Sequence, residues 1–341
     1  MKIPAERLEA WVSRVFLNGG MLQQDADTVA RVLVWANLRG MDTHGVVRVP
    51  RYMEWLRSGE LNARPAMTTR NEAPACVLLE ADRAAGPVSM VLATDLALGK
   101  AQAAGIGLCL VRGTTHTAAL GYYTHRAAEA GMAAIAFSAS GPNMAYHGAR
   151  VAGVSTAPLA LAVPGADGPI ALDMASGVVS LGRLALARRK GEALEPGWAL
   201  DAQGLPTTDP RQAKLPLPLG GAKGSGLSLL IECLTSLLAG NPLLAEVLEG
   251  TPQGRRHRQN GAIIALDIAR FVEPMQFGRE VARLARDIKA LPPQSGEEIL
   301  VPGERGARAA AQRSRDGIPL PEPVLEELRA LARSLNMEEL S

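Results

Sequence analysis

The stretch Arg39-Gly-Met-Asp-Thr-His-Gly-Val-Val-Arg-Val-Pro-Arg-Tyr52 places a histidine four residues before an arginine and eight before a tyrosine. Residues spaced by four lie on one side of a helix, so these three side chains are expected to point the same way. Proline is tolerated only in a first helical turn, so Pro50 places the helix start near Val46–Val49, with His44 in the preceding loop. The stretch indicates either a proton-exchanging site for a carboxylate or a capped surface helix whose histidine contacts nothing.

Helical and strand patterns alternate on both sides of this stretch. Apolar residues at helical spacing predict helices over residues 4–18, 24–39, 87–104, 118–131, 177–189, 227–239, 276–290 and 321–335. Short apolar runs predict strands over residues 76–80, 106–111, 133–138, 170–175 and 262–267. His116 falls between a buried strand and a helix, at the sheet edge where open α/β sheets bind ligands. The chain is therefore expected to be an α/β protein.

The composition is that of an ordinary globular protein with ample core. The 341 residues are 47% hydrophobic and 21% charged, with a formal net charge of +2. This near balance gives no reason to expect nucleic acid or a membrane as partner. Three distant cysteines, Cys76, Cys109 and Cys233, are interpreted as reduced thiols, and the charged N-terminus is not that of a signal peptide. We expect a cytoplasmic protein.

The common cofactor and metal motifs are absent from the sequence. No G-x-G-x-x-G follows a strand and no P-loop occurs, although Gly220–Gly226, which contains Lys223, precedes a helix. Its backbone N–H groups and lysine suit a phosphate, but the loop equally suits a tight turn that lets the helix pack closely. The five histidines lack metal-ligand spacing, so no metal site is expected. Of these histidines, His125 is expected to be packed or on the surface, His147 to lie in a loop within possible reach of a ligand, and His257 to be solvated.

Several segments, in order along nearly the whole chain, resemble the non-Rossmann malate/L-lactate dehydrogenase family, which includes sulfolactate and ureidoglycolate dehydrogenases and Δ1-piperideine-2-carboxylate reductases. The segments that carry the resemblance are Asp42–Tyr52, His116–Gly131, Ala171–Ala175, Gly197–Asp201 with Pro206–Pro210, Lys223–Leu227 and Val301–Glu304. The resemblance implies a three-layer α/β fold with a mixed sheet, like that of sulfolactate dehydrogenase. It also implies a homodimer. Residues 1–110 and 291–341 would form a helical lobe for substrate binding and dimerisation, and residues 111–290 an NAD(P)-binding sheet lobe.

The same resemblance assigns roles to individual residues. His44 would exchange a proton with the substrate, oriented by Thr43, and His116 would face the substrate as an acid or base. The substrate, a small carboxylate, would contact Arg48, Tyr52, Thr156 and Arg183. The cofactor would be NAD or NADP, with NADPH favoured. Its expected contacts are Ser140, Asp173, Met174, Ala175, Lys223, Gly224, Pro302, Gly303, Glu304 and Arg305.

Three functions remain open at this point. Reduction of a 2-oxo acid is favoured because Arg183 resembles the lysine of the hydroxyacid dehydrogenases more than the acidic residue of the cyclic-imine reductases. Reduction of a cyclic ketimine is the alternative, because Lys223–Ser228 is similar to the imine-reductase form of that loop. An inactive ligand-binding homologue is the third, because Ser155-Thr-Ala-Pro158 stands where the family usually has Gly-Thr-Asn-Pro.

Overall fold

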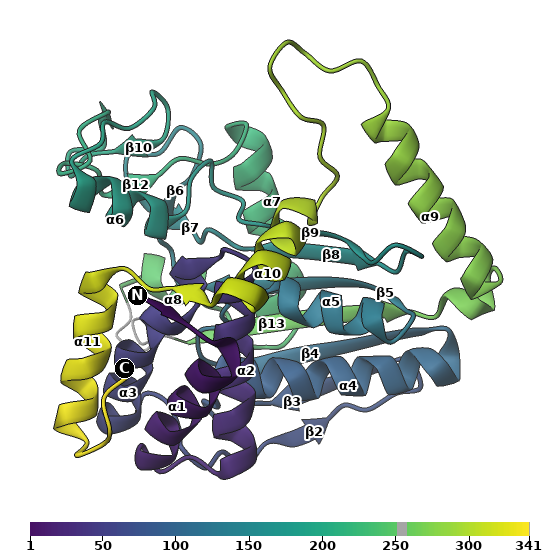
Figure 1. Ribbon diagram of the computed structural model, residues 1–341, viewed down its shortest axis with the longest axis horizontal. Helices are drawn as coiled ribbons and strands as arrows, with labels where there is room; N and C mark the ends of the chain where they lie inside the picture. Colours follow the sequence, from purple (N-terminus) through teal and green to yellow (C-terminus); the bar gives the residue numbers. More distant parts are fainter. Residues whose placement is uncertain (251–257, 341) are drawn as a thin grey trace.

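A seven-stranded mixed sheet forms the middle of the molecule in a computed structural model that describes residues 1–250 and 258–340 (Figure 1). In spatial order its strands are β2 (Thr68–Arg70), β3 (Cys76–Glu80), β4 (Ile106–Thr114), β13 (Gln259–Leu266), β5 (Ala133–Ser140), β8 (Leu159–Val163) and β9 (Ile170–Met174). Only β3 and β4 run parallel; every other neighbouring pair in this sheet is antiparallel. The expected mixed sheet is confirmed.

Helices cover both faces of the sheet and complete the three expected layers. One face packs against α4 (Gly86–Ala104) and α5 (Gly121–Glu129), and the other against α7 (Ala222–Glu232) with the π-helical turn that continues it, η3 (Cys233–Leu237). Small residues allow α4 to pack closely on β4. An ideal Cβ on Gly107 of β4 would lie 2.0 Å from the Ala97 carbonyl oxygen of α4.

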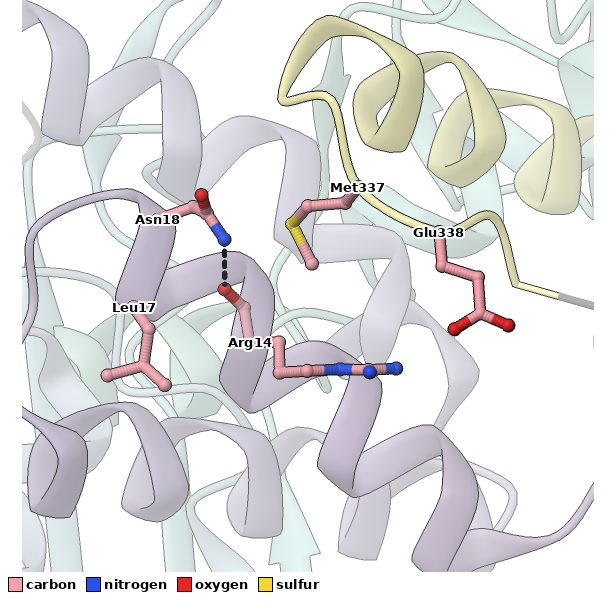
Figure 2. A pocket seen from close by; sticks show the side chains of 5 residues that line it. All are labelled: Arg14, Leu17, Asn18, Met337 and Glu338. Atoms are coloured by element: carbon pink, nitrogen blue, oxygen red, sulfur yellow. Dashed lines mark hydrogen bonds between the residues drawn. The ribbon is translucent and has the colours of Figure 1, made fainter.

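A helical cluster lies beside the sheet and contains the N- and C-terminal segments. It comprises α1 (Ala5–Asn18), α2 (Gln23–Leu38), α3 (Val49–Ser58) and α11 (Glu322–Ser334), with β1 (Lys2–Ile3) paired to β14 (Ile318–Pro319). Its core includes Trp11, Leu33, Tyr52 and Leu328. A hollow of about 180 Å³ lies between α1 and the C-terminal segment, and Figure 2 shows Asn18 bonded to the Arg14 carbonyl in its wall. None of the predicted site residues lines this hollow.

A smaller lobe follows β9 and lies to one side of the sheet (Figure 1). It contains α6 (Leu181–Lys190) and a three-stranded sheet of β10 (Ala199–Leu200), β11 (Pro206–Thr207) and β12 (Leu215–Pro216). Its separate core comprises Val179, Leu184, Ala187, Leu194, Ala199 and Ala213. The proline-rich segment that follows Glu195 is therefore an ordered excursion.

The remaining elements connect these parts. They are β6 (Met144–Ala145), β7 (Ala152–Val154), α8 (Leu244–Leu248), α9 (Pro274–Lys289) and α10 (Glu304–Asp316). In Figure 1, α9 lies at the margin of the molecule, and a long segment leads from it back to α10. No helix in the described chain is long and apolar enough to cross a membrane.

Several element bounds differ from the sequence expectations. Lys223 and Gly224 lie inside the first turn of α7 rather than in a loop before the helix, and α10 was not predicted. The helix expected after His116 is α5, and it starts at Gly121 rather than at Ala118, whose φ of 54° is left-handed. The lobe boundary expected at residue 110 falls inside β4, so the sheet takes strands from both expected lobes.

Candidate active site

The stretch Arg39–Tyr52 forms two short 3₁₀ turns, η1 (Asp42–His44) and η2 (Val46–Arg48), that lead into α3. Pro50 lies in the first turn of α3, where its missing N–H leaves no helical bond unmade. Asn37 of α2 holds the turns in place, because its side-chain oxygen accepts from the Val46 N–H at 2.8 Å and its amide donates to Asp42 at 2.6 Å. The expected helix start near residues 46–49 agrees with this structure.

The imidazole rings of His44 and His116 lie nearly parallel to each other. The rings of His44 and His116 are 5.7 Å apart between centroids, with 19° between their planes. Arg48 lies close enough to affect both rings. Burial, and then the charge of Arg48, lowers the pKa of His44 to about 4. Burial, Arg48 and His44 together lower the pKa of His116 well below its usual value. Both rings are therefore neutral at pH 7.

Hydrogen bonds to the two rings restrict their tautomers. The Tyr52 hydroxyl lies 2.7 Å from Nδ1 of His116 and donates to the His116 carbonyl oxygen at 2.9 Å. Because that hydroxyl has one proton, both contacts are satisfied when Nδ1 of His116 carries a proton and Nε2 is free to accept one. Thr43 Oγ1 lies 3.0 Å from Nδ1 of His44. If Nδ1 of His44 carries the ring proton and donates to Thr43 Oγ1, Nε2 of His44 is also free to accept a proton.

Arg48 is held by the same turn that positions His44. Its Nε donates to the Thr43 carbonyl oxygen at 2.7 Å, and Arg48 forms no ion pair with a carboxylate among residues 1–250 and 258–340. The remaining N–H groups of the guanidinium suit an anionic ligand, since arginine binds carboxylates through paired donors.

A cavity of about 620 Å³ contains four of the predicted cofactor residues, Asp173, Pro302, Gly303 and Arg305, together with Trp35, Arg39 and His125. The turn before α10 docks on β9, because the Ala171 N–H donates to the Pro302 carbonyl at 3.2 Å. An ideal Cβ on Gly303 would lie 2.9 Å from the Ala171 carbonyl oxygen, so this close approach requires glycine. Arg39 stacks on Trp35 at 5.1 Å and donates to the Gly303 carbonyl at 3.2 Å.

Asp173 lies near the end of β9. Its side chain is open to solvent on one side and packed against protein atoms on the others. Its Oδ2 accepts from the Gly121 N–H at 2.7 Å, at the start of α5. Desolvation by the surrounding protein outweighs that bond and raises the pKa of Asp173 to about 6.

The other predicted cofactor residues lie on neighbouring elements. Ser140 ends β5 and Thr114 ends β4, and both pair with Gln259 of β13, so Ser140 shares a sheet edge with the segment that leads to His116. Lys223 is exposed in the first turn of α7. An ideal Cβ on Gly224 would lie 2.5 Å from the Ser176 carbonyl oxygen, so Gly224 lets α7 approach the loop after Met174 and Ala175.

Three predicted residues are engaged elsewhere. The Glu304 carboxylate binds Lys289 at 2.5 Å and Arg308 at 2.6 Å, and these bonds lower its pKa to about 2. Arg183 is exposed and lies 3.7 Å from Glu192, while Thr156 contributes its backbone to Asn143 and Ser176. Their assigned roles stay predictions, as do those of the other site residues.

Residues that sequence reasoning missed also shape the site. The Ser176 hydroxyl is buried without a hydrogen-bond partner, directly after the strand-end residues, so extending that motif by one position would have found it. Arg313 of α10 binds both carboxylate oxygens of Asp42, at 2.7 and 3.1 Å. Nothing near Asp42 in the sequence indicates this contact.

His125 and His147 lie apart from the two stacked rings. His125 lines the 620 Å³ cavity and pairs with Glu129 at 3.2 Å, while His147 is exposed next to Gly221. His257 lies outside the described residues. Within the described chain, no group of three or more His, Cys, Asp or Glu residues is placed to hold a metal ion.

The fold and the geometry together define a class: an α/β protein with a non-Rossmann mixed sheet, in which two imidazoles lie beside a guanidinium. Residues 3–329 match the malate/L-lactate dehydrogenase family, and the chain belongs to it. It is therefore a member of an oxidoreductase family whose named relatives are hydroxyacid dehydrogenases.

Individual relatives align over almost the full chain. A malate dehydrogenase of Pyrococcus horikoshii is 34% identical, with 100% of this chain and 97% of the relative covered. The NAD(+) ureidoglycolate dehydrogenase of Escherichia coli K12 is 30% identical, with 96% and 95% covered. The solved structure of the P. horikoshii malate dehydrogenase superposes with a TM-score of 0.90 at 32% identity, covering 100% and 97%. That of Δ1-piperideine-2-carboxylate reductase from Pseudomonas syringae gives 0.86 at 29%, covering 97% and 100%.

Proposed function

We propose that the protein is an NAD(P)-dependent oxidoreductase that interconverts a small 2-oxo acid, of the malate or lactate type, and its 2-hydroxy acid. The observation that carries this proposal is the position of Arg48 beside the two neutral imidazoles of His44 and His116. A carboxylate bound to Arg48 would hold the adjacent carbon and its oxygen within reach of a histidine. The malate and ureidoglycolate dehydrogenases among the relatives act on compounds of this chemical class by their names.

The residues present fit a dinucleotide cofactor. The buried Ser176 hydroxyl without a partner and the 620 Å³ cavity next to Asp173 are features that a bound polar ligand would use. When bound, the nicotinamide supplies or accepts the hydride. The residues that would hold the cofactor are Ser140, Asp173, Met174, Ala175, Lys223, Gly224 and the turn from Pro302 to Arg305.

The proton is handled by this chain's own residues. Neutral His44 accepts the hydroxyl proton when a hydroxy acid is oxidised, and Thr43 fixes its ring. In the reducing direction His44 must carry a proton before it can donate one. A substrate carboxylate on Arg48 offsets the positive charge that lowers the His44 pKa, so substrate binding itself favours protonation.

We favour NADPH as the cofactor. Arg39 and Arg305 line the 620 Å³ cavity, and neither forms an ion pair with a carboxylate in the part of the chain that the structure describes. Guanidinium groups bind phosphate through several donors, which suits the extra phosphate of NADP. We also propose a cytoplasmic location and a homodimer whose interface includes the exposed leucines of α7 and η3, which belong to the sheet lobe and not to the helical lobe that was expected to dimerise.

The test is a substrate panel run with both cofactors. Purified protein is expected to oxidise NADPH when pyruvate-like oxo acids are added, and to oxidise NADH less rapidly. Turnover confined to cyclic ketimines would instead support the function of the P. syringae relative, an alternative favoured by the Lys223–Ser228 loop. Thermal stabilisation by cofactor without any turnover would support an inactive homologue.

His44→Ala provides the matched test of the site. It is expected to lower turnover by roughly 100-fold or more, because general acid–base catalysis contributes that much. Binding of NADPH should stay close to that of the unaltered protein. Unchanged turnover would remove His44 from the mechanism.

A further inference from the structure

The first turn of α6 lies directly against Thr43, although α6 belongs to the smaller lobe. An ideal Cβ on Gly182 would lie 2.5 Å from Cγ2 and 2.7 Å from Cβ of Thr43, closer than real Cβ atoms approach. Gly182 is helical and its φ is not left-handed, so the backbone conformation itself would accept any residue. Glycine is required here for space.

Thr43 connects this contact to the side chains of His44 and Arg48. Its hydroxyl lies 3.0 Å from Nδ1 of His44, and its carbonyl accepts from Nε of Arg48 at 2.7 Å. Its methyl group faces Gly182. One residue therefore contacts the proton-exchanging ring, the carboxylate-binding cation and the smaller lobe.

The smaller lobe holds α6 in a defined position. Leu184 and Ala187 of α6 are buried in the core of that lobe, and the Ser180 side chain accepts from the Arg183 N–H at the start of the helix. A methyl group on Gly182 cannot be absorbed by a flexible side chain, because the atoms it meets include Cβ of Thr43. Either α6 or the turn that carries His44 must move.

We propose that Gly182 is a positioning residue for the reaction: its missing side chain lets α6 pack on Thr43 and thereby fixes His44 and Arg48 together. The inference rests on the proposed function, because these two side chains must act on one substrate. The groups that face His44 in this arrangement are Thr43, Arg48 and His116.

The first experiment is Gly182→Ala. The turnover number for the oxo acid is expected to fall roughly 10- to 100-fold, as small misplacements of catalytic groups do, while the KM for NADPH stays unchanged. Alanine favours helix more than glycine does, so α6 is not weakened, and the melting temperature reports whether the fold is intact. The control is Gly99→Ala in α4, where an ideal Cβ meets nothing within 4 Å. Its turnover should equal that of the unaltered protein.

A double-mutant cycle tests whether the effect passes through Thr43. In a Thr43→Gly background the atoms that clash are gone, so adding Gly182→Ala should cause no further loss of turnover. An equal loss in both backgrounds would overturn the inference, as would full turnover of Gly182→Ala alone.

A measurement that needs no substrate separates this inference from the proposed function. A shift of α6 or of the turn that carries His44 changes the packing around the His44 ring, so the pKa of that ring, followed by NMR, should move from about 4 in Gly182→Ala. In the Thr43→Gly background Gly182→Ala should leave the titration where Thr43→Gly alone puts it. An unchanged His44 titration in Gly182→Ala would overturn the inference even if no substrate is found, whereas absent turnover in the unaltered protein would count only against the proposed function.

Discussion

Arg48 acts on its neighbours through both its charge and its shape. The charge is the second cause, after burial, of the low pKa of His44, and it also lowers the pKa of His116. The planar guanidinium fixes the direction in which a carboxylate can bind. These two contributions can be separated by replacing Arg48 with a residue that keeps one and loses the other.

Arg48→Gln removes the charge. The KM for the oxo acid is expected to rise about 10- to 100-fold, since a hydrogen bond to a charged group contributes about 1.5–3 kcal/mol. The His44 pKa should rise from about 4 but stay below its usual value, because burial remains the larger cause. In the proposed mechanism hydroxy-acid oxidation needs neutral His44, so this activity should be lost as pH falls through that pKa. The acid limb of the kcat/KM profile for the hydroxy acid should therefore move to higher pH.

Arg48→Lys keeps the charge without the paired donors, so the KM should rise while the acid limb stays in place. Arg51→Gln on α3 is the control, because Arg51 is paired with Glu54 at 2.6 Å, and it should change neither quantity. An acid limb that stays in place in Arg48→Gln would show that Arg48 does not control the proton affinity of His44.

Local pattern and tertiary contact contributed differently to what could be predicted of this site. Spacing and Pro50 predicted the position of the helix start and the loop that holds His44, because both depend on backbone rules that act over a few residues. The contacts of Asn37 and Arg313 with Asp42 were not predicted. Arg313 is separated from Asp42 by 271 positions, so no local spacing reports their contact.

The element α10 was missed for a related reason. Its sequence, Glu304 to Asp316, consists largely of alanine, arginine and other polar residues, and none of its residues is buried. Its helical periodicity sets alanine against charged residues, and without a stripe of large apolar side chains a search for apolar residues at helical spacing does not detect it. The helix nevertheless carries Arg313 to the turn that holds His44, where Arg313 binds Asp42 and the Asn37 carbonyl oxygen.

That contact is expected to stabilise the turn that holds His44. Arg313→Ala should lower the free energy of unfolding by about 1–3 kcal/mol, because a charge-assisted, partly buried pair and its bonds to Asp42 and Asn37 are lost. Turnover should fall as well, since η1 loses its support, and urea denaturation together with the substrate assay measures both effects. Arg315→Ala, an exposed position on the same helix, is the control. Stability and turnover equal to those of the control would show that the turn holds itself.

At the scale of the whole molecule, the class of fold was predictable and the strand order was not. Alternating strand and helix patterns predicted an α/β protein, and the resemblance to a family supplied the mixed sheet. The sequence patterns alone do not place β13 between β4 and β5, since its apolar run is like that of any buried strand. Strand order follows from packing of the complete chain.

An exposed apolar surface on α7 and η3 is suited to contact with a second copy of the chain. The side of α7 and η3 that faces away from the sheet exposes Leu230, Leu234, Leu237 and Leu238, each more than half exposed. A cavity of about 430 Å³ beside them is lined mostly by apolar residues, among them Leu229, Leu237 and Leu248. Water on such a surface is unfavourable, and contiguous apolar patches of this kind are typical of protein interfaces.

Leu230→Glu with Leu234→Glu is expected to convert a dimer into a monomer. Each leucine buried in an interface contributes about 1.5–3 kcal/mol, and a carboxylate in its place must also lose water, so the dimer Kd should rise by roughly 100-fold or more. Sedimentation velocity over a range of concentrations measures the change, and the melting temperature of the monomer reports its fold. Leu205→Glu, at an exposed turn of the smaller lobe, is the control and should leave the mass unchanged. A dimer that persists with both glutamates would place the interface on another surface, and a monomeric unaltered protein would contradict the homodimer itself.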